Sequence, residues 1–245
     1  MTVELQRRSA WRASFAVGFA VSMYGVSFGA LAVASGLDIW QACVLSLIMF
    51  SGGSQFALIG VLASGGVAAG PAAIAGATLL GLRNGLYAIR VSPIIGPGWL
   101  KRLVAGHLTI DESTAVATAQ PTPASQRVGF WATGVIIYVG WNLTTLLGAV
   151  LGDLIGDVRQ FGLDAAAGAA FLGLVWPRLT ALQPIVVAVG AAVVAAVLLP
   201  AVPQGVPVLA AVVVAVIVGW PNLFSARPSS AHTTVAAPVA KEEHS

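Results

Sequence analysis

Long apolar runs, separated by short polar or glycine-rich connections, make up most of the chain. A helix that spans a bilayer needs about 20 apolar residues. The candidate runs cover residues 13–36, 39–63, 70–98 and 128–151, with shorter runs at 165–176, 184–199 and 206–220. The pattern predicts an all-α, polytopic integral membrane protein with about seven or eight transmembrane segments.

Small and polar residues interrupt the second run. Residues 49–56 read MFSGGSQF. Glycine costs about 1 kcal/mol relative to alanine inside a helix, and an amide in hydrocarbon needs hydrogen-bond partners. Transporters use broken helices of this kind to present backbone groups to a substrate, although small residues also permit a close helix–helix contact. The sequence predicts an interrupted helix here and leaves both roles open.

The third run carries two charges at membrane depth. Arg83 and Arg90 are seven residues apart, so they share a helix face with Tyr87 between them. Arginine in mid-membrane costs at least about 2.5 kcal/mol, so this face is not expected to contact lipid. Gly81 and Gly85 flank the first arginine and indicate a second candidate break.

A fourth segment, 103–120, is too polar to face lipid and too apolar for an ordinary loop. It contains His107, Asp111 and Glu112. We expect a re-entrant segment or a helix shielded inside the bundle. Its acids either neutralise the arginines of the third run or serve as counter-ions and proton carriers at a polar site, and both interpretations stay open.

Composition supports a membrane protein. The 245 residues are 58% hydrophobic and only 9% charged, and an ordinary soluble domain has about 25% charged residues. The single cysteine, Cys43, allows neither an internal disulfide nor a cysteine metal site. The net charge of +3 does not indicate nucleic-acid binding, and we expect no metal and no cofactor.

The arginines near the start predict a cytoplasmic N-terminus at 1–12, followed by a retained first span rather than a cleaved signal peptide. We expect a transmembrane transport domain at 13–222 and a disordered tail at 223–245, which is rich in Ala, Ser, Thr and Pro. An even number of crossings places most of the remaining basic residues on the cytoplasmic side, as the charge rule for membrane proteins favours.

The sequence Gly-Leu-Asp at 36–38 recurs at 162–164, which is a candidate internal repeat.

Enzyme chemistry is not expected. Ser51 or Ser54 with His107 would be a candidate nucleophile and base, but neither serine lies in a complete Gly-x-Ser-x-Gly turn. The chain has no HExxH sequence for a metal and no Walker A loop for a nucleotide. The runner-up interpretation is a membrane subunit, or a transporter of another small solute, in which the intramembrane charges are purely structural.

Three polar motifs in this order resemble the AzlC-type branched-chain amino-acid permease family. They are MFSGGSQF at 49–56, Leu-Arg-Asn-x-Leu-Tyr at 82–87 and Asp-Glu-Ser at 111–113. The family pattern has asparagine and histidine where this chain has Gly81 and Asn84. The resemblance covers roughly residues 15–220.

The resemblance implies the large subunit of a two-component exporter in the inner membrane, working with a small AzlD-type membrane subunit. Valine, leucine and isoleucine are the implied substrates, with methionine or analogues as further ones, and the proton gradient is the implied driving force. We expect the substrate to contact Ser51, Gly52, Gly53, Ser54, Gln55, Arg83 and Asn84. We expect counter-ion or proton-coupling roles for Asp111, Glu112, His107 and Arg90.

Overall fold

The computed structural model describes residues 3–155, 172–173, 175–176, 179–202 and 206–219. Within these residues the secondary structure is helical and contains no strand, so the all-α prediction is confirmed. The longest helices are α1 (Val3–Ser22), α5 (Gly70–Ile95) and α8 (Pro123–Ile155). The shorter ones are α2 (Tyr24–Ala34), α3 (Ile39–Ile48), α4 (Gly52–Gly65), η1 (Gly66–Ala69), α6 (Trp99–Leu108), α7 (Asp111–Thr118), α10 (Leu182–Leu198) and α11 (Val206–Gly219).

Three helical stretches in the described part are long and apolar enough to cross a membrane. They are Glu4–Ala34, Gly52–Ile95 and Pro123–Ile155. The first is interrupted at Met23 between α1 and α2, where the Ser22 hydroxyl donates to the Gly18 carbonyl at 2.7 Å. The predicted count of seven or eight segments is not confirmed.

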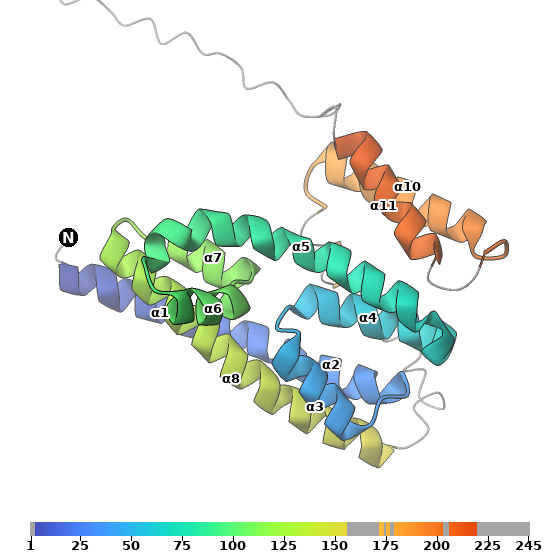
Figure 1. The fold of residues 1–245 in the computed structure, drawn as a ribbon, viewed down its shortest axis with the longest axis horizontal. Helices are drawn as coiled ribbons and strands as arrows, with labels where there is room; N and C mark the ends of the chain where they lie inside the picture. The colour runs from blue at the N-terminus through green and yellow to red at the C-terminus, as the bar shows by residue number, and fades with distance from the viewer. Residues whose placement is uncertain (1–2, 156–171, 174, 177–178, 203–205, 220–245) are drawn as a thin grey trace, which may run out of the picture.

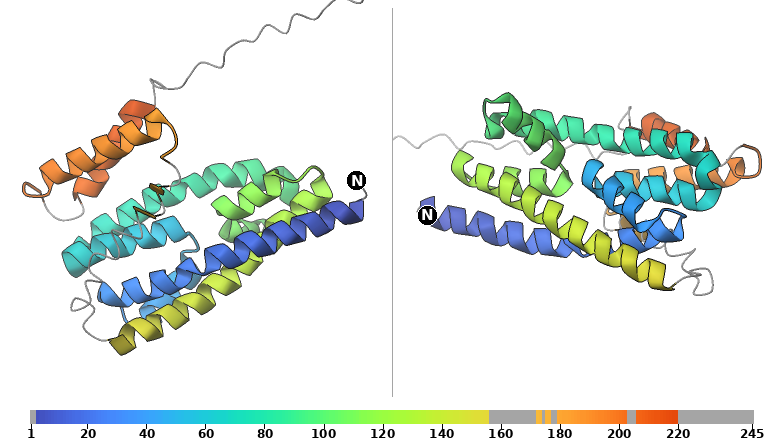
Figure 2. Two further views of the ribbon diagram at one scale, coloured as in Figure 1. Left: turned by 180° about the vertical axis from the view of Figure 1, so that it is seen from behind. Right: turned by 60° about the horizontal axis from the view of Figure 1, so that its bottom comes forward.

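Helices α1 and α2 run side by side with α8 and in the same direction (Figures 1 and 2). Thr133 donates to Ser14 across 119 positions at 2.9 Å, and Thr144 donates to the Ser22 carbonyl across 122 positions at 2.5 Å. A Cβ on Gly148 would collide with the Val26 carbonyl further along the pair. This constant offset defines a parallel pair, and its glycines let the two backbones touch.

Helices α3 and α4 form a hairpin that reaches only to the middle of the molecule (Figure 1). The two helices have 10 and 14 residues, or about 15 and 21 Å, against a hydrocarbon core of about 30 Å. The chain turns back at Gly66, whose φ of +58° favours glycine. Helix α4 then lies antiparallel to α5, and a Cβ on Gly53 would lie 3.4 Å from Leu80, near the midpoint of that helix.

Helices α6 and α7 form a second hairpin that enters from the opposite end. The Arg127 Nε donates to the Ile94 carbonyl at 2.8 Å, so α5 ends where α8 begins. The Thr122 hydroxyl donates to the Gln6 side chain at 3.2 Å, so the residues after α7 lie beside the start of α1. The segment therefore enters and leaves at the same end, and its tip lies at Thr109 and Ile110 between the two helices.

The two hairpins change the predicted topology. The run 39–63 was expected to cross with a break, but it folds back on itself, while segment 103–120 takes the re-entrant form. The second break expected at Gly81 and Gly85 was wrong, because α5 is continuous through both residues. The second interruption lies at Thr109 instead, where the polar residues begin.

The hairpins also repeat a structural unit. A spanning helix followed by a half-length hairpin occurs twice, first as α1–α2 with α3–α4 and then as α5 with α6–α7. The two units enter from opposite ends, as in inverted-topology repeats. The repeat predicted at 162–164 lies outside the described residues, as does the predicted tail at 223–245.

Basic side chains gather at one end of the molecule. They lie on the start of α1, the last turns of α5, the start of α6 and the start of α8, and are Arg7, Arg8, Arg12, Arg90, Lys101, Arg102 and Arg127. The described residues at the opposite end carry Asp38 and Asp153 and no lysine or arginine. The molecule is therefore strongly polarised along its long axis.

Helices α10 and α11 pack against each other beside α5. A Cβ on Gly190 would lie 2.9 Å from Val214, and one on Gly76 of α5 would lie 4.0 Å from Leu209. With 17 and 14 residues, or about 25 and 21 Å, they are shorter than the other candidate spans.

Candidate functional site

The tips of the two hairpins meet at the centre of the molecule, and each places the N-terminus of a helix there. Helix α4 begins at Gly52 and α7 begins at Asp111. The first N–H groups of a helix have no partner within it, and the helix dipole makes this end partly positive. Two such ends converging at mid-depth form an environment that attracts negative charge.

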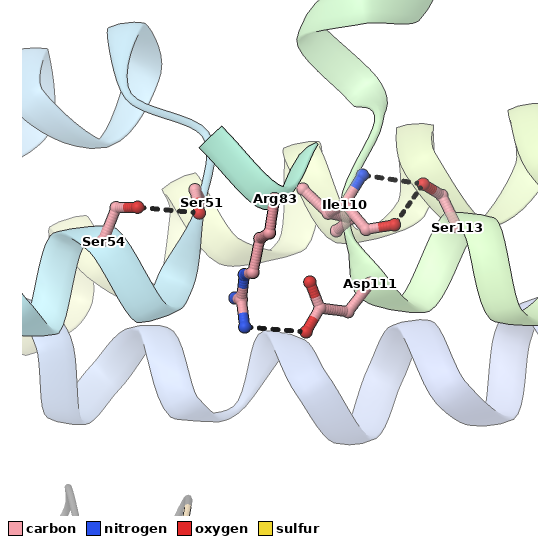
Figure 3. Close-up of polar contacts among 6 residues, drawn as sticks. All are labelled: Ser51, Ser54, Arg83, Ile110, Asp111 and Ser113. Atoms are coloured by element: carbon pink, nitrogen blue, oxygen red, sulfur yellow. Dashed lines mark hydrogen bonds and ion pairs between the residues drawn. The ribbon is translucent and has the colours of Figure 1, made fainter. Parts of the chain in front are cut away.

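The N-terminus of α4 has no side-chain cap. Ser51 holds the capping position, but its hydroxyl donates to the Ser54 hydroxyl at 3.2 Å instead of accepting from a backbone N–H (Figure 3). Serine at this position usually satisfies one of the unpaired N–H groups. The first-turn donors of α4 are therefore left for another acceptor.

The N-terminus of α7 is fixed by its own hairpin. The Ser113 hydroxyl accepts from the Ile110 N–H at 3.1 Å (Figure 3). It also donates to the Leu108 carbonyl at 2.8 Å. These bonds tie the last turn of α6 to the first turn of α7. The position of Asp111, directly after the tip, is thereby set by backbone geometry.

Arg83 extends from the middle of α5 into the space between the two tips (Figure 3). Its Nη1 lies 3.2 Å from Asp111 Oδ2, and the two side chains are 27% and 18% exposed. The Arg83 Nε is buried without a hydrogen-bond partner among the described residues. The ion pair offsets part of the cost of holding an arginine at this depth and leaves one donor unused.

A cavity of about 350 Å³ opens beside this ion pair. One wall is polar and the remaining walls are aliphatic and aromatic. The polar wall is formed by Ser51, Gly52, Gly53, Arg83, Asp111 and Glu112. The other lining residues are Val21, Tyr24, Phe50, Phe56, Leu80, Ile110, Ile137, Trp141, Gly173 and Val175. A mostly apolar cavity with a few convergent polar groups has the form of a small-molecule site.

Gly53 has a steric role in this wall. A Cβ built on Gly53 would lie 3.0 Å from the Arg83 Nη2, so a side chain there would make the guanidinium shift by a few tenths of an ångström away from the α4 N-terminus. Gly52 is similarly tight, because its Cβ would lie 2.9 Å from the Trp141 ring. The glycine pair therefore lets Arg83 and Trp141 approach the α4 N-terminus closely.

Gln55 lies beneath the cavity rather than on its wall. Its side chain is fully buried, and its amide nitrogen donates to the Met49 carbonyl at 2.6 Å. Its amide oxygen accepts from the Trp141 indole N–H at 2.8 Å. The amide thus stabilises the interrupted backbone and holds Trp141, which is 4% exposed, as a floor of the cavity.

The remaining predicted site residues lie behind or away from the cavity. The His107 ring packs 5.9 Å from Phe50 and 5.4 Å from Tyr138, centroid to centroid, between the two hairpin tips. Asn84 is half-buried on α5 with its amide oxygen unpartnered among the described residues.

Arg90 and Ser54 are also displaced from the cavity wall. Arg90 is exposed near the end of α5, where a long side chain can extend to the interface. Ser54 lies behind Ser51 and faces a second, more open space of about 360 Å³ against α5. The structure thus brings Ser51, Gly52, Gly53, Arg83, Asp111 and Glu112 together and places the other predicted residues outside the cavity.

A comparison with known protein families identifies the family of this chain. The family model described as AzlC protein matches residues 16–155. The chain belongs to the AzlC protein family. The matched region contains most of the first long stretch, the other two stretches and both hairpins, with every residue of the polar wall.

The AzlC family is of a transporter type and is associated with branched-chain amino-acid transport, so this chain is assigned to a membrane family rather than to an enzyme family. No curated protein and no solved structure matched the chain. The described residues also hold no group of three His, Cys, Asp or Glu side chains that could bind a metal ion.

Sequence reasoning missed the aromatic part of the site. Trp141 contacts both Gln55 and the cavity, and Phe28 and Phe56 pack around it at centroid distances of 6.3 Å. The sequence does not show whether a tryptophan within an apolar run lines a cavity or simply packs against its neighbours. The only hint was its polar N–H, which needs a partner in hydrocarbon.

Proposed function

We propose that this AzlC family member transports branched-chain amino acids across the inner membrane and that the central cavity binds the substrate. The Arg83–Asp111 ion pair between two helix N-termini carries the proposal. An amino acid is a zwitterion, and its two charges match the two members of this pair. The cavity therefore offers each end of the substrate a partner of opposite charge.

Substrate binding would exchange one ion pair for two. The carboxylate would lie against Arg83 and the unpaired N–H groups at Gly52 and Gly53, while the ammonium would lie against Asp111 or Glu112. Both protein charges stay neutralised with the substrate bound or absent, which limits the cost of desolvation at either stage. The aliphatic side chain would face Leu80, Ile137 and Trp141, which line the apolar walls.

Proton coupling is assigned to the acids of α7. Asp111 and Glu112 begin that helix and line the cavity, beside Arg83 and the N-terminus of α4. His107 is a second titratable group close to the tips and stays a candidate for the relay. Outward transport follows from the family resemblance alone.

The orientation is inferred from charge. Because the basic residues gather at the end that holds the start of α1, we place this end and the N-terminus in the cytoplasm. A small AzlD-type subunit is the proposed partner, on the strength of the family resemblance. The exposed apolar face of α5, which includes Leu82, Leu86 and Ile89, is available to it or to lipid.

A second candidate function is a membrane subunit, or a carrier of another solute, in which the charges only hold the fold. The observation in its favour is the ion pair itself, since Asp111 already neutralises Arg83. The two candidates differ in what happens when both charges are removed together.

The test is efflux of preloaded, labelled valine from cells that produce the chain with and without a candidate small subunit. Arg83→Gln is the test variant, and Lys101→Gln is its control because Lys101 is an exposed cation away from the cavity. We expect faster efflux with both subunits, its loss in Arg83→Gln and its retention in Lys101→Gln. Unchanged valine efflux with both subunits in the membrane would exclude valine export.

A further inference from the structure

A second site lies at the basic end, in a groove of about 410 Å³ between α1 and α8 that shares no lining residue with the central cavity. Its lining residues are Arg7, Trp11, Arg127, Val128, Trp131, Ala132, Val135 and Ile136. Two arginines stand at the outer end of the groove, two tryptophans lie one turn further in, and aliphatic side chains continue toward the centre.

The two helices present the same residue types, an arginine and a tryptophan, at the same depth along the pair. Arg7 and Trp11 are four apart on α1, and Arg127 and Trp131 are four apart on α8, so each pair shares a helix face. The offset of 120 positions between the pairs agrees with the offsets of 119 and 122 seen in the hydrogen bonds between these helices. The parallel packing therefore builds a groove with two matching walls.

The arginines of this groove have no counter-ion in the described part of the chain. The ion pair of α1 joins Arg8 to Glu4 at 3.5 Å and leaves Arg7 out. Arg127 uses its Nε to donate to the Ile94 carbonyl, which fixes the guanidinium while its terminal nitrogens make no ion pair. Two guanidinium groups facing one groove repel each other unless an anion lies between them.

The apolar floor indicates what kind of anion fits. From Arg127 to Ile136 the floor extends about 13 Å along α8, toward the centre of the bilayer. Tryptophans near helix ends anchor at the level of lipid headgroups. A soluble anion would pair with the arginines but leave the aliphatic floor uncovered. A phospholipid would pair with the arginines through its phosphate and cover the floor with an acyl chain.

We propose that this groove binds an anionic phospholipid, with its headgroup phosphate between Arg7 and Arg127 and an acyl chain along Val128, Ala132 and Val135. Basic pockets between membrane helices recognise anionic headgroups in this way. The lipid would bridge the N-terminal parts of α1 and α8 through the two arginines. This site is independent of the proposed transport function.

The test is native mass spectrometry of the purified full-length chain titrated with phosphatidylglycerol, and with phosphatidylcholine of the same acyl chains. The main variant is Arg7→Gln, because Arg7 makes no ion pair whose loss would disturb the fold. Arg12→Gln is the matched control, since Arg12 is also an exposed arginine of α1 but lies about 140° around the helix and outside the groove. The double variant Arg7→Gln/Arg127→Gln removes both charges.

We expect phosphatidylglycerol to bind more tightly than phosphatidylcholine, with about a fivefold loss in Arg7→Gln, a larger loss in the double variant and no loss in Arg12→Gln. Inorganic phosphate should not displace the lipid. Equal binding of the two lipids, or equal losses in Arg7→Gln and Arg12→Gln, would overturn the proposal. Full displacement by phosphate would also overturn it, because the groove would then be a site for soluble anions.

Discussion

Arg83 of α5 and Asp111 of α7 form an ion pair of 3.2 Å where the two hairpin tips meet. The pair joins a spanning helix to the first residue of a half-length helix, so it fixes the depth of the second hairpin. It also sets a positive and a negative group side by side on the wall of the central cavity. Fold and proposed function thus depend on the same two side chains.

Removing one member of this pair should harm folding as well as transport. Asp111→Asn leaves Arg83 without its counter-ion, and breaking a buried pair costs about 3 kcal/mol. The double variant Arg83→Gln/Asp111→Asn should recover the yield and melting temperature, because no lone charge remains. Its transport should stay at background, since the substrate carboxylate has lost its cation and the ammonium has lost one of its two acids. Recovery of transport in the double variant would show that the charges are structural.

Gln55 and Trp141 should act as a unit. Gln55→Ala removes the hydrogen bonds to the Met49 carbonyl and the Trp141 indole and should cost about 2–3 kcal/mol, while releasing the indole that forms the cavity floor. Trp141→Phe should reduce transport similarly, and the double variant should add little to either single change.

Gln41→Ala is the control for the glutamine, because Gln41 caps α3 at the surface. It should cost less than about 1 kcal/mol and leave transport intact. Losses of transport that simply add in the Gln55 and Trp141 double variant would contradict the positioning role of Gln55.

The parallel contact of α1–α2 with α8 should not tolerate larger residues. A Cβ on Gly29 would collide with the Thr145 carbonyl, and a Cβ on Gly148 with the Val26 carbonyl. Because backbone atoms cannot move aside as a side chain can, Gly29→Ala and Gly148→Ala should each destabilise by about 1–3 kcal/mol or more. Thermal unfolding in detergent measures this loss.

Gly106→Ala provides the comparison for these two glycines. No atom lies within 4 Å of a Cβ built on Gly106, which is also helical. The substitution should be neutral or stabilise the protein by up to about 1 kcal/mol. Equal melting temperatures in all three variants would contradict the packing seen here.

The hairpins predict which loops share a side of the membrane. In a Cys43→Ser background, cysteines at Lys101 and Pro121 should both react with an impermeant reagent from one side. Cysteines at Trp40 and Val67 should both react from the other side. These positions flank the second and the first hairpin, and Val67 and Trp40 are 92% and 75% exposed. Labelling of either pair from opposite sides would mean that the segment between them crosses the membrane.

Part of this arrangement could be predicted from local sequence. The glycines and serines at 51–54 indicate an interruption, and α3 does end at Ile48 before α4 begins at Gly52. Unpaired charge in hydrocarbon is so costly that pairing of Arg83 with an acid of segment 103–120 was one of the two interpretations that the sequence left open. Local propensity and the cost of desolvation were enough for these features.

The reversal of direction could not be predicted in the same way. Residues 39–63 have the length and polarity of a crossing helix, and only packing against α5 and α8 shows that they fold back. Gly81 and Gly85 suggested a break that α5 does not have, because α4 packs on this helix beside Gly81. Trp141 was missed because its contact with Gln55 joins residues 86 positions apart.

The central claim is that the amino acid binds against Arg83 at the N-terminus of α4. Binding of labelled leucine to the purified chain, comparing Gly53→Ala with Gly85→Ala, tests it most directly. A Cβ on Gly53 would lie 3.0 Å from the Arg83 guanidinium, whereas a Cβ on Gly85 meets no atom within 4 Å. We predict wild-type affinity in Gly85→Ala and at least a roughly tenfold loss in Gly53→Ala, about 1.4 kcal/mol. Equal leucine affinity in the two folded variants would contradict the account.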